Sequence, residues 1–171
     1  MNNEKWILLA EDNLNDADLA VRAIAANGTA EMVVVTHNGA QAMDCLRLRT
    51  ESSRATLGNP ALILLDLKMP RMNGFEVLRQ IRGDPKLKTI PVVVFTTSRE
   101  PEDLARCYRL GANAYVVKPV GFEELVRVLN SIKRFWLELN EPPPAEVPAG
   151  LRAVLVRRTR SAMNRMLVPS F

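Results

Sequence analysis

Residues 7–16 read ILLAEDNLND, and this stretch joins an apolar run directly to a pair of carboxylates. The run at residues 7–10 is typical of a buried strand. Glu11 and Asp12 follow it at once, with Asp16 close behind. Two carboxylates about 4 Å apart repel each other by about 1 kcal/mol in water and about 4 kcal/mol at an effective dielectric of 20. Water or a cation must therefore offset this repulsion.

Four more short apolar runs follow along the chain, at residues 31–36, 61–66, 91–96 and 114–117. Continuous apolar strands are typical of a parallel sheet that is buried on both faces. Apolar residues at helical spacing predict helices between and after the strands, over residues 16–26, 39–48, 74–81, 102–110 and 122–139. This (βα)5 alternation predicts a doubly wound α/β fold with an extended last helix. Two strand orders are common in such folds, and we expect the flavodoxin-like parallel sheet in the order 2-1-3-4-5.

Polar side chains stand at the ends of four of these strands. Glu11 and Asp12 follow the first strand, Asp66 ends the third, Thr96 ends the fourth and Lys118 follows the fifth. Because parallel strands end at one edge of the sheet, we expect these side chains to converge there, where such folds bind ligands. Clustered carboxylates suit a hard divalent cation, and Mg²⁺ in particular binds one or two carboxylates together with waters and a phosphate.

This combination of groups predicts phosphoryl transfer to a carboxylate. A carboxylate can attack phosphorus and form an acyl phosphate, while a cation and Lys118 neutralise the charge on the transferred group. Each residue alone has a plainer interpretation: Asp66 as a helix cap, Thr96 as a strand former and Lys118 as a surface lysine. Their position at neighbouring strand ends favours the functional interpretation.

The stretches ILLAEDN, LILLDLKMPRMNGFEVLRQIR, IPVVVFTTS and GANAYVVKP, within residues 5–139, resemble the receiver domain of two-component response regulators, of the chemotaxis-receiver type. The resemblance implies that Asp66 is the phosphoacceptor and a ligand of Mg²⁺. It also implies that Asp12 binds the ion directly, that Glu11 binds it through water, and that the backbone carbonyl of Lys68 is a further ligand.

The same resemblance implies how the phosphoryl group is held and sensed. Lys118 and Thr96 would contact the phosphoryl group, and the Lys118–Pro119 peptide would be cis. Tyr115 would be the switch aromatic that turns inward when Thr96 moves. The chain would then be a phosphorylatable signalling switch in a phosphorelay, supplied by a histidine kinase. It would not be an enzyme and would have no DNA-binding output domain.

The ending SIKRFWLELN, together with NLNDADLAVRAI, resembles the single-domain regulators that pair with bacterial and cyanobacterial phytochromes. This implies a phytochrome as the partner kinase. In those regulators the long last helix helps to form a homodimer. We therefore expect a homodimer through the predicted fourth helix (residues 102–110), fifth strand (114–117) and fifth helix (122–139) with the C-terminal extension, in which Phe135 and Trp136 take part.

Two other functions fit the sequence less well, and a phosphorylation-independent adaptor remains a further alternative. A haloacid-dehalogenase-type phosphatase also uses an aspartate nucleophile, but its DxDx[TV] pattern would need an aspartate where Lys68 stands. Flavin mononucleotide binding would need a hydroxyl-rich phosphate loop after the first strand, where Glu11 and Asp12 stand instead. A P-loop is absent from the sequence.

Charge and composition separate the body of the chain from its end. Residues 1–140 hold 18 basic and 17 acidic residues, whereas residues 141–171 hold five arginines and two glutamates. A nearly neutral body argues against a nucleic-acid surface. The sequence has no signal peptide and no apolar run near the ~20 residues of a membrane span. With Cys45 and Cys107 as its only cysteines, it suits a reducing compartment, and a cytoplasmic location is expected.

The sequence predicts three segments: a receiver domain over residues 1–140, a proline-rich linker over 141–150, and a basic tail over 151–171. Three interpretations of the tail stay open. It could be disordered, it could dock as an arm on a partner or a second copy, or it could form a short helix at a membrane surface.

Overall fold

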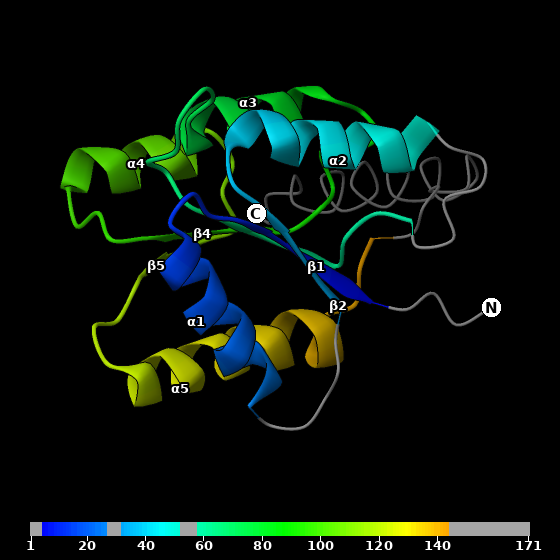
Figure 1. The fold of residues 1–171 in the computed structure, drawn as a ribbon. Coiled ribbons are helices and arrows are strands. Elements are labelled where there is room, and N and C mark those ends of the chain that lie inside the picture. The colour runs from blue at the N-terminus through cyan, green and yellow to red at the C-terminus, as the bar shows by residue number, and fades with distance from the viewer. Residues whose placement is uncertain (1–4, 27–31, 52–57, 144–171) are drawn as a thin grey trace, which may run out of the picture. The chain divides into compact units, whose positions relative to one another are not determined.

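The computed structural model describes residues 5–26, 32–51 and 58–143. Five strands form one parallel sheet in the order β2-β1-β3-β4-β5 (Figure 1). The strands are β1 (Trp6–Ala10), β2 (Met32–Thr36), β3 (Leu62–Leu65), β4 (Val92–Thr96) and β5 (Ala114–Val117). The predicted fold class and strand order are thereby confirmed, with strand bounds that differ by one residue at most.

Five α-helices cover the two faces of the sheet. Figure 1 shows α1 (Leu14–Ala25) and α5 (Phe122–Lys133) on one face, and α2 (Gly39–Glu51), α3 (Gly74–Gly83) and α4 (Pro101–Arg109) on the other. Along β1, Trp6 and Leu8 pack in the cluster under α2 and α3, whereas Ile7 and Leu9 pack in the cluster under α1 and α5. Both faces of the strand are therefore buried, which explains why its sequence is continuously apolar.

The last helix changes its winding near its end. After Lys133 the chain continues as a π-helical segment, Arg134–Leu139, where one α-helix was expected over residues 122–139. The residues buried in this region recur every fourth position: Leu125, Leu129, Lys133 and Leu137. An α-helix has ~3.6 residues per turn, so residues four positions apart move gradually away from the face that meets the core. The wider turn of the π-helix brings Leu137 back to the core. The expected extension of this helix is nevertheless confirmed.

Helix α3 begins in direct contact with the end of β3. Gly74 N donates a hydrogen bond to the Leu67 carbonyl at 3.0 Å. A Cβ atom at Gly74 would lie 2.3 Å from the backbone oxygen of Asp66 and 2.8 Å from the Cα of Leu67. Only glycine permits this approach, because both obstacles are backbone atoms that no rotamer change can move.

None of the helices in the described residues is long and apolar enough to cross a membrane. Residues 141–143 of the predicted linker are exposed and have no regular secondary structure. The rest of the linker and the whole basic tail, residues 144–171, lie outside the described residues, so these two segments stay predictions.

Gly74→Ala should lower the free energy of unfolding by about 1–3 kcal/mol, because the added methyl group must push the backbone of Asp66 or the start of α3 aside. Urea unfolding measures this change. The matched control is Gly83→Ala, since a Cβ atom there meets no atom within 4 Å. We expect the control to change stability by no more than about 1 kcal/mol, in the stabilising direction. Equal stabilities of the two variants would contradict the proposed backbone clash.

Candidate functional site at the carboxyl edge of the sheet

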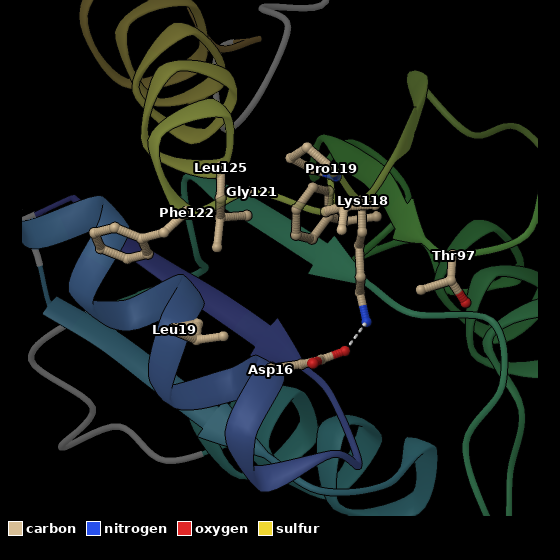
Figure 2. A pocket seen from close by; sticks show the side chains of 10 residues that line it. Asp16, Leu19, Thr97, Lys118, Pro119, Gly121, Phe122 and Leu125 are labelled. Carbon is tan, nitrogen blue, oxygen red and sulfur yellow. Dashed lines mark hydrogen bonds and ion pairs between the residues drawn. The ribbon is translucent and has the colours of Figure 1, made fainter.

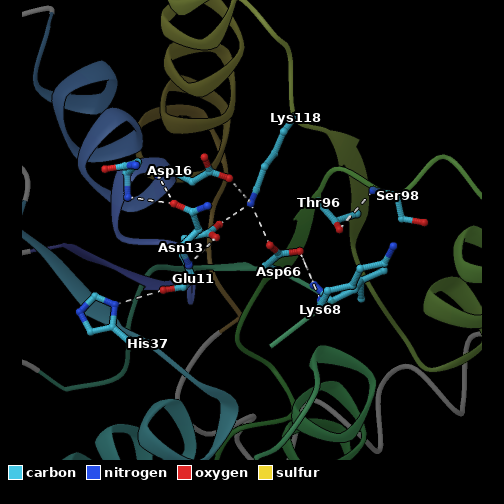
Figure 3. A network of polar contacts seen from close by, with 11 residues as sticks. Glu11, Asn13, Asp16, His37, Asp66, Lys68, Thr96, Ser98 and Lys118 are labelled. Carbon is cyan, nitrogen blue, oxygen red and sulfur yellow. Dashed lines mark hydrogen bonds and ion pairs between the residues drawn. The ribbon is translucent and has the colours of Figure 1, made fainter. Parts of the chain in front are cut away.

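Four of the predicted site residues, Glu11, Asp66, Thr96 and Lys118, lie together at the carboxyl edge of the sheet (Figure 3). Backbone hydrogen bonds extend the sheet ladder one step past the strands and place these residues. Asp66 N donates to Ala10 O at 3.0 Å, and Lys118 N donates to Thr96 O at 2.8 Å. The register of the sheet, rather than any loop, therefore sets the position of the site.

Three carboxylates lie close enough to share one cation. Glu11, Asp12 and Asp66 each offer one oxygen, and these oxygens lie within 4.8 Å of one another. Glu11 and Asp66 are buried, whereas Asp12 is exposed. A set of carboxylate oxygens of this kind fits a hard divalent cation. The expected ligands are thus brought together, although the backbone carbonyl of Lys68 stays a prediction as a ligand.

Asp66 is held at both of its carboxylate oxygens. Oδ1 accepts a hydrogen bond from Leu67 N at 2.6 Å, with Lys68 N further away at 3.5 Å. Oδ2 accepts from Lys118 Nζ at 2.8 Å. With 6% of the residue exposed, this carboxylate has one fixed orientation. Lys68 itself contributes only its backbone here, because its side chain is exposed.

The ammonium group of Lys118 is the centre of the polar network. It forms ion pairs with Asp66 at 2.8 Å, with Asp16 at 3.2 Å and with Glu11. Burial alone would lower the pKa of Lys118, but its contacts with Asp66 and Glu11 outweigh burial and raise the pKa above its usual value. Lys118 therefore stays positively charged throughout the physiological pH range.

The pKa of Glu11 is set by a different balance of burial and neighbouring charges. Burial raises the pKa of Glu11 to about 7, and the nearby charge of Asp66 acts in the same direction. The hydrogen bond and charge of Lys118 lower this pKa but do not cancel the effect of burial. Glu11 also accepts a hydrogen bond from Asn13 N at 3.2 Å through its other oxygen. The same carboxylate thus contacts both the strand-end lysine and the start of α1.

Thr96 and Tyr115 are linked through Ser98. Thr96 is fully buried, and its hydroxyl accepts a hydrogen bond from Ser98 N at 3.4 Å. Tyr115, which is half-buried, donates from its hydroxyl to the Ser98 carbonyl at 3.1 Å. The Ser98 hydroxyl donates in turn to Asp103 of α4 at 2.6 Å. These bonds join the expected switch residues to α4, while the switch itself stays a prediction.

Two features of the site differ from the sequence argument. No cis peptide bond occurs among the described residues, so the expectation of a cis Lys118–Pro119 peptide is wrong for this structure. A role for Asp16 was not predicted from the sequence, although this residue lies five positions after Glu11 and its carboxylate pairs with Lys118. Its place in the first turn of a helix that follows a strand end is the signal that could have identified it.

A pocket of about 360 Å³ opens beside Lys118 (Figure 2). Its polar lining includes Asp16 and Lys118. Its apolar lining comes from α1, from the end of β4, from the loop after β5 and from the start of α5: Leu19, Phe95, Pro119, Val120, Phe122 and Leu125. Several of these side chains are exposed at the surface, with Val120 and Phe122 the most exposed among them. An apolar surface therefore borders the entrance to the site.

The raised pKa of Glu11 has a consequence for stability. In the unfolded chain this carboxyl has its ordinary pKa of 4.5, so the folded state binds its proton more tightly. Relative to Glu11→Gln, the metal-free wild type should lose stability as the pH rises from about 4.5 to about 7. Urea unfolding with a chelator at about pH 5 and about pH 8 measures this difference. Glu123→Gln, at an exposed position of α5, should follow the wild type. Identical pH profiles for the wild type and Glu11→Gln would contradict the shift.

The chain resembles known proteins in sequence. The family model of the response regulator receiver domain matches residues 7–130. The probable methanogenesis regulatory protein FilR2 of Methanothrix harundinacea is 42% identical over 137 residues, which cover 80% of this chain and 86% of that protein. Response regulator Rcp1 of Synechocystis is 36% identical over 144 residues, which cover 84% of this chain and 97% of that protein.

Solved structures agree with these matches. The phosphorylated cyanobacterial phytochrome response regulator RcpA superposes with a TM-score of 0.74 at 39% identity, covering 82% of this chain and 99% of RcpA. The Mn²⁺-bound form of Rcp1 has a TM-score of 0.71 at 35% identity, and the match covers 81% of this chain and 99% of Rcp1. The bacteriophytochrome response regulator RtBRR has a TM-score of 0.63 at 43% identity, and the match covers 91% of this chain and 95% of RtBRR. The chain therefore belongs to the response regulator receiver family and is similar to the single-domain regulators associated with phytochromes.

Proposed function

We propose that this chain is the receiver of a two-component phosphorelay and that Asp66 accepts the phosphoryl group. The observation that carries the proposal is the arrangement around Asp66: a buried carboxylate at a strand end, paired with Lys118 and close to Glu11 and Asp12. RcpA, a relative of known structure, is described as phosphorylated, which supports the same chemistry here.

The proposed donor is a phosphohistidine of a histidine kinase. A carboxylate oxygen of Asp66 attacks the phosphorus, a P–O bond forms, and the P–N bond to the donor histidine breaks. The histidine nitrogen keeps the bonding electron pair. Lys118 then donates a hydrogen bond to an oxygen of the phosphoryl group, and the Thr96 hydroxyl donates to another. Positioning and charge neutralisation of this kind are the main requirements of phosphoryl transfer.

The proposed cofactor is Mg²⁺. Asp12 and Asp66 would bind it directly, Glu11 through water, and the carbonyl of Lys68 would complete the protein ligands. When bound, the ion neutralises charge that develops on the transferred group. The carboxylate oxygens within 4.8 Å of one another support this proposal, as does the Mn²⁺-bound structure of Rcp1.

Phosphorylation would act on the face formed by α4, β5 and α5. Thr96 is bonded to Ser98, which carries the carbonyl that the Tyr115 hydroxyl binds. If Thr96 turns toward a phosphoryl group, the segment with Ser98 moves, and the partner of Tyr115 moves with it. A phosphoryl group adds about −1.5 to −2 charges, which is sufficient to shift the populations of two such states.

The proposed kinase partner is a phytochrome, because several relatives are named as phytochrome response regulators. The exposed apolar side chains beside the pocket, Leu19, Val120 and Phe122, support docking of a protein donor next to Asp66. Members of this family are typically signalling proteins rather than enzymes, and one phosphoryl group per chain is expected. A cytoplasmic location accords with the two free cysteines, Cys45 and Cys107.

A small phosphodonor such as acetyl phosphate, with Mg²⁺, should label the wild type at up to one phosphoryl group per chain. Asp66→Asn should take up none, because an amide oxygen is a poor nucleophile and forms no acyl phosphate. Phosphate-affinity electrophoresis and intact mass measure the label. Asp18→Asn, an exposed carboxylate of α1 paired with Arg22, is the control and should be labelled like the wild type. Stable labelling of Asp66→Asn, or release of many phosphates per chain, would overturn the proposal.

A homodimer is the proposed assembly, with Phe135 and Trp136 in its interface. Phe135 is 50% exposed and contacts Trp136 edge-to-face, with ring centroids 4.9 Å apart. Leu139 is 63% exposed nearby in the same segment, which extends the apolar surface. Trp136 is half-buried and packs partly on the core beneath α1 and α5. Phe135 is therefore the side chain that is free to meet a second copy.

Phe135→Ala should weaken the dimer, because truncation of a buried aromatic anchor in an interface costs about 2 kcal/mol or more. Light scattering after size-exclusion chromatography over a dilution series measures the dimer–monomer equilibrium. Leu48→Ala on α2, at another exposed apolar position, should leave the equilibrium unchanged. A monomeric wild type, or equal dissociation of the two variants, would contradict this assembly.

A further inference from the structure

Asp16 is a third carboxylate on the ammonium group of Lys118. Its Oδ2 atom lies 3.2 Å from Lys118 Nζ, and Figures 2 and 3 show its side chain pointing from the start of α1 toward this lysine. The Asp16 side chain is 38% exposed, whereas those of Glu11 and Asp66 are almost fully buried. Asp16 therefore contacts the proposed phosphorylation site from its solvent side.

Helix capping does not account for this position. In α3, Glu76 lies three residues after the cap residue Asn73 and completes a capping box by accepting from Asn73 N at 2.9 Å. Asp16 holds the equivalent position three residues after Asn13 in α1. There the cap residue's N–H donates to Glu11 at 3.2 Å instead. The Asp16 carboxylate is thus not used to close a capping box, and it pairs with Lys118.

All hydrogen-bond donors of the Lys118 ammonium group already have a partner in this structure. An ammonium group has three N–H donors, and three carboxylates occupy them: Glu11, Asp16 and Asp66. A phosphoryl group on Asp66 can take a hydrogen bond from Lys118 only if one of these partners gives way. Asp16 is the most exposed of the three and the most distant, so it is the partner that an incoming anion displaces most easily.

The negative charge of Asp16 also acts on the two proposed ligands in opposite directions. Asp16 shares the ammonium group of Lys118 with Glu11 and Asp66. At this range its charge attracts a divalent cation bound at those carboxylates and repels a dianionic phosphoryl group. Because Asp16 is partly exposed, solvent weakens both effects without removing them.

We propose that Asp16 sets the charge selectivity of this site: it strengthens the binding of a divalent cation and weakens the binding of the phosphoryl group. Asp16 is a positioning residue, because it acts through Lys118 and through its charge rather than by contact with the reacting atoms. The inference rests on the proposed function of Asp66 as a phosphoacceptor.

The test is Asp16→Asn, which keeps the size of the side chain and removes its charge. Titration calorimetry measures the affinity for Mg²⁺ alone, and then the affinity for beryllofluoride, an analogue of the phosphoryl group, at saturating Mg²⁺. We expect Mg²⁺ to bind about threefold more weakly and beryllofluoride about three- to tenfold more tightly than in the wild type. Loss of structure alone would weaken both, so the opposite signs identify the role of the charge.

Two further variants complete the test. Asp16→Ser also removes the charge but keeps a hydroxyl in the first turn of α1, and it should show the same two shifts. Asp18→Asn removes an equal charge from the same helix, at a carboxylate that is paired with Arg22 at 2.9 Å, and it should change neither affinity.

The outcomes separate this inference from the proposed function. If the wild type binds no beryllofluoride in the presence of Mg²⁺, the proposed function of Asp66 fails. If the wild type binds it but Asp16→Asn leaves both affinities unchanged, or weakens both, the role of Asp16 is overturned while the phosphoacceptor stands. A change of the same size in Asp18→Asn would also overturn it, because net charge alone would then explain the shifts.

Discussion

The ion pairs of Lys118 hold together side chains from two strand ends and from the start of a helix. Its ammonium group joins Glu11 after β1, Asp66 after β3 and Asp16 at the start of α1. Bringing two carboxylates into a buried position costs free energy that only a partner of opposite charge can offset. Without this lysine, the strand ends would carry uncompensated negative charge. The charge balance of the carboxyl edge therefore depends on one side chain that follows the last strand.

Most of the fold follows from local patterns in the sequence. Apolar runs mark each strand because the sheet is buried on both faces, and right-handed crossovers between the strands give a doubly wound sheet. The convergence of Asp66, Thr96 and Lys118 follows in turn, because a parallel sheet brings the ends of neighbouring strands to one edge. These residues could be named from the sequence since their positions depend on the topology alone.

The features that the sequence did not predict depend on contacts between distant parts of the chain. Asp16 pairs with a lysine 102 residues away, and nothing near Asp16 in the sequence indicates that partner. The π-helical segment at the end of the last helix depends on how Leu137 meets the core, which periodicity alone does not define. The trans geometry of the Lys118–Pro119 peptide differs from what the family resemblance implied, and the local sequence permits either isomer.

The close approach of Gly74 to Asp66 has a further consequence for how this protein can be altered. Backbone lies against backbone at the proposed phosphoacceptor, with no intervening side chain whose size could be adjusted. A substitution at Gly74 therefore changes the site through its backbone. Substitutions that leave this backbone in place are available on the solvent side of the site, at Asp12 and Lys68, which are exposed, and at Asp16, which is partly exposed. Any engineering of signal duration in this chain would have to begin with those solvent-facing positions.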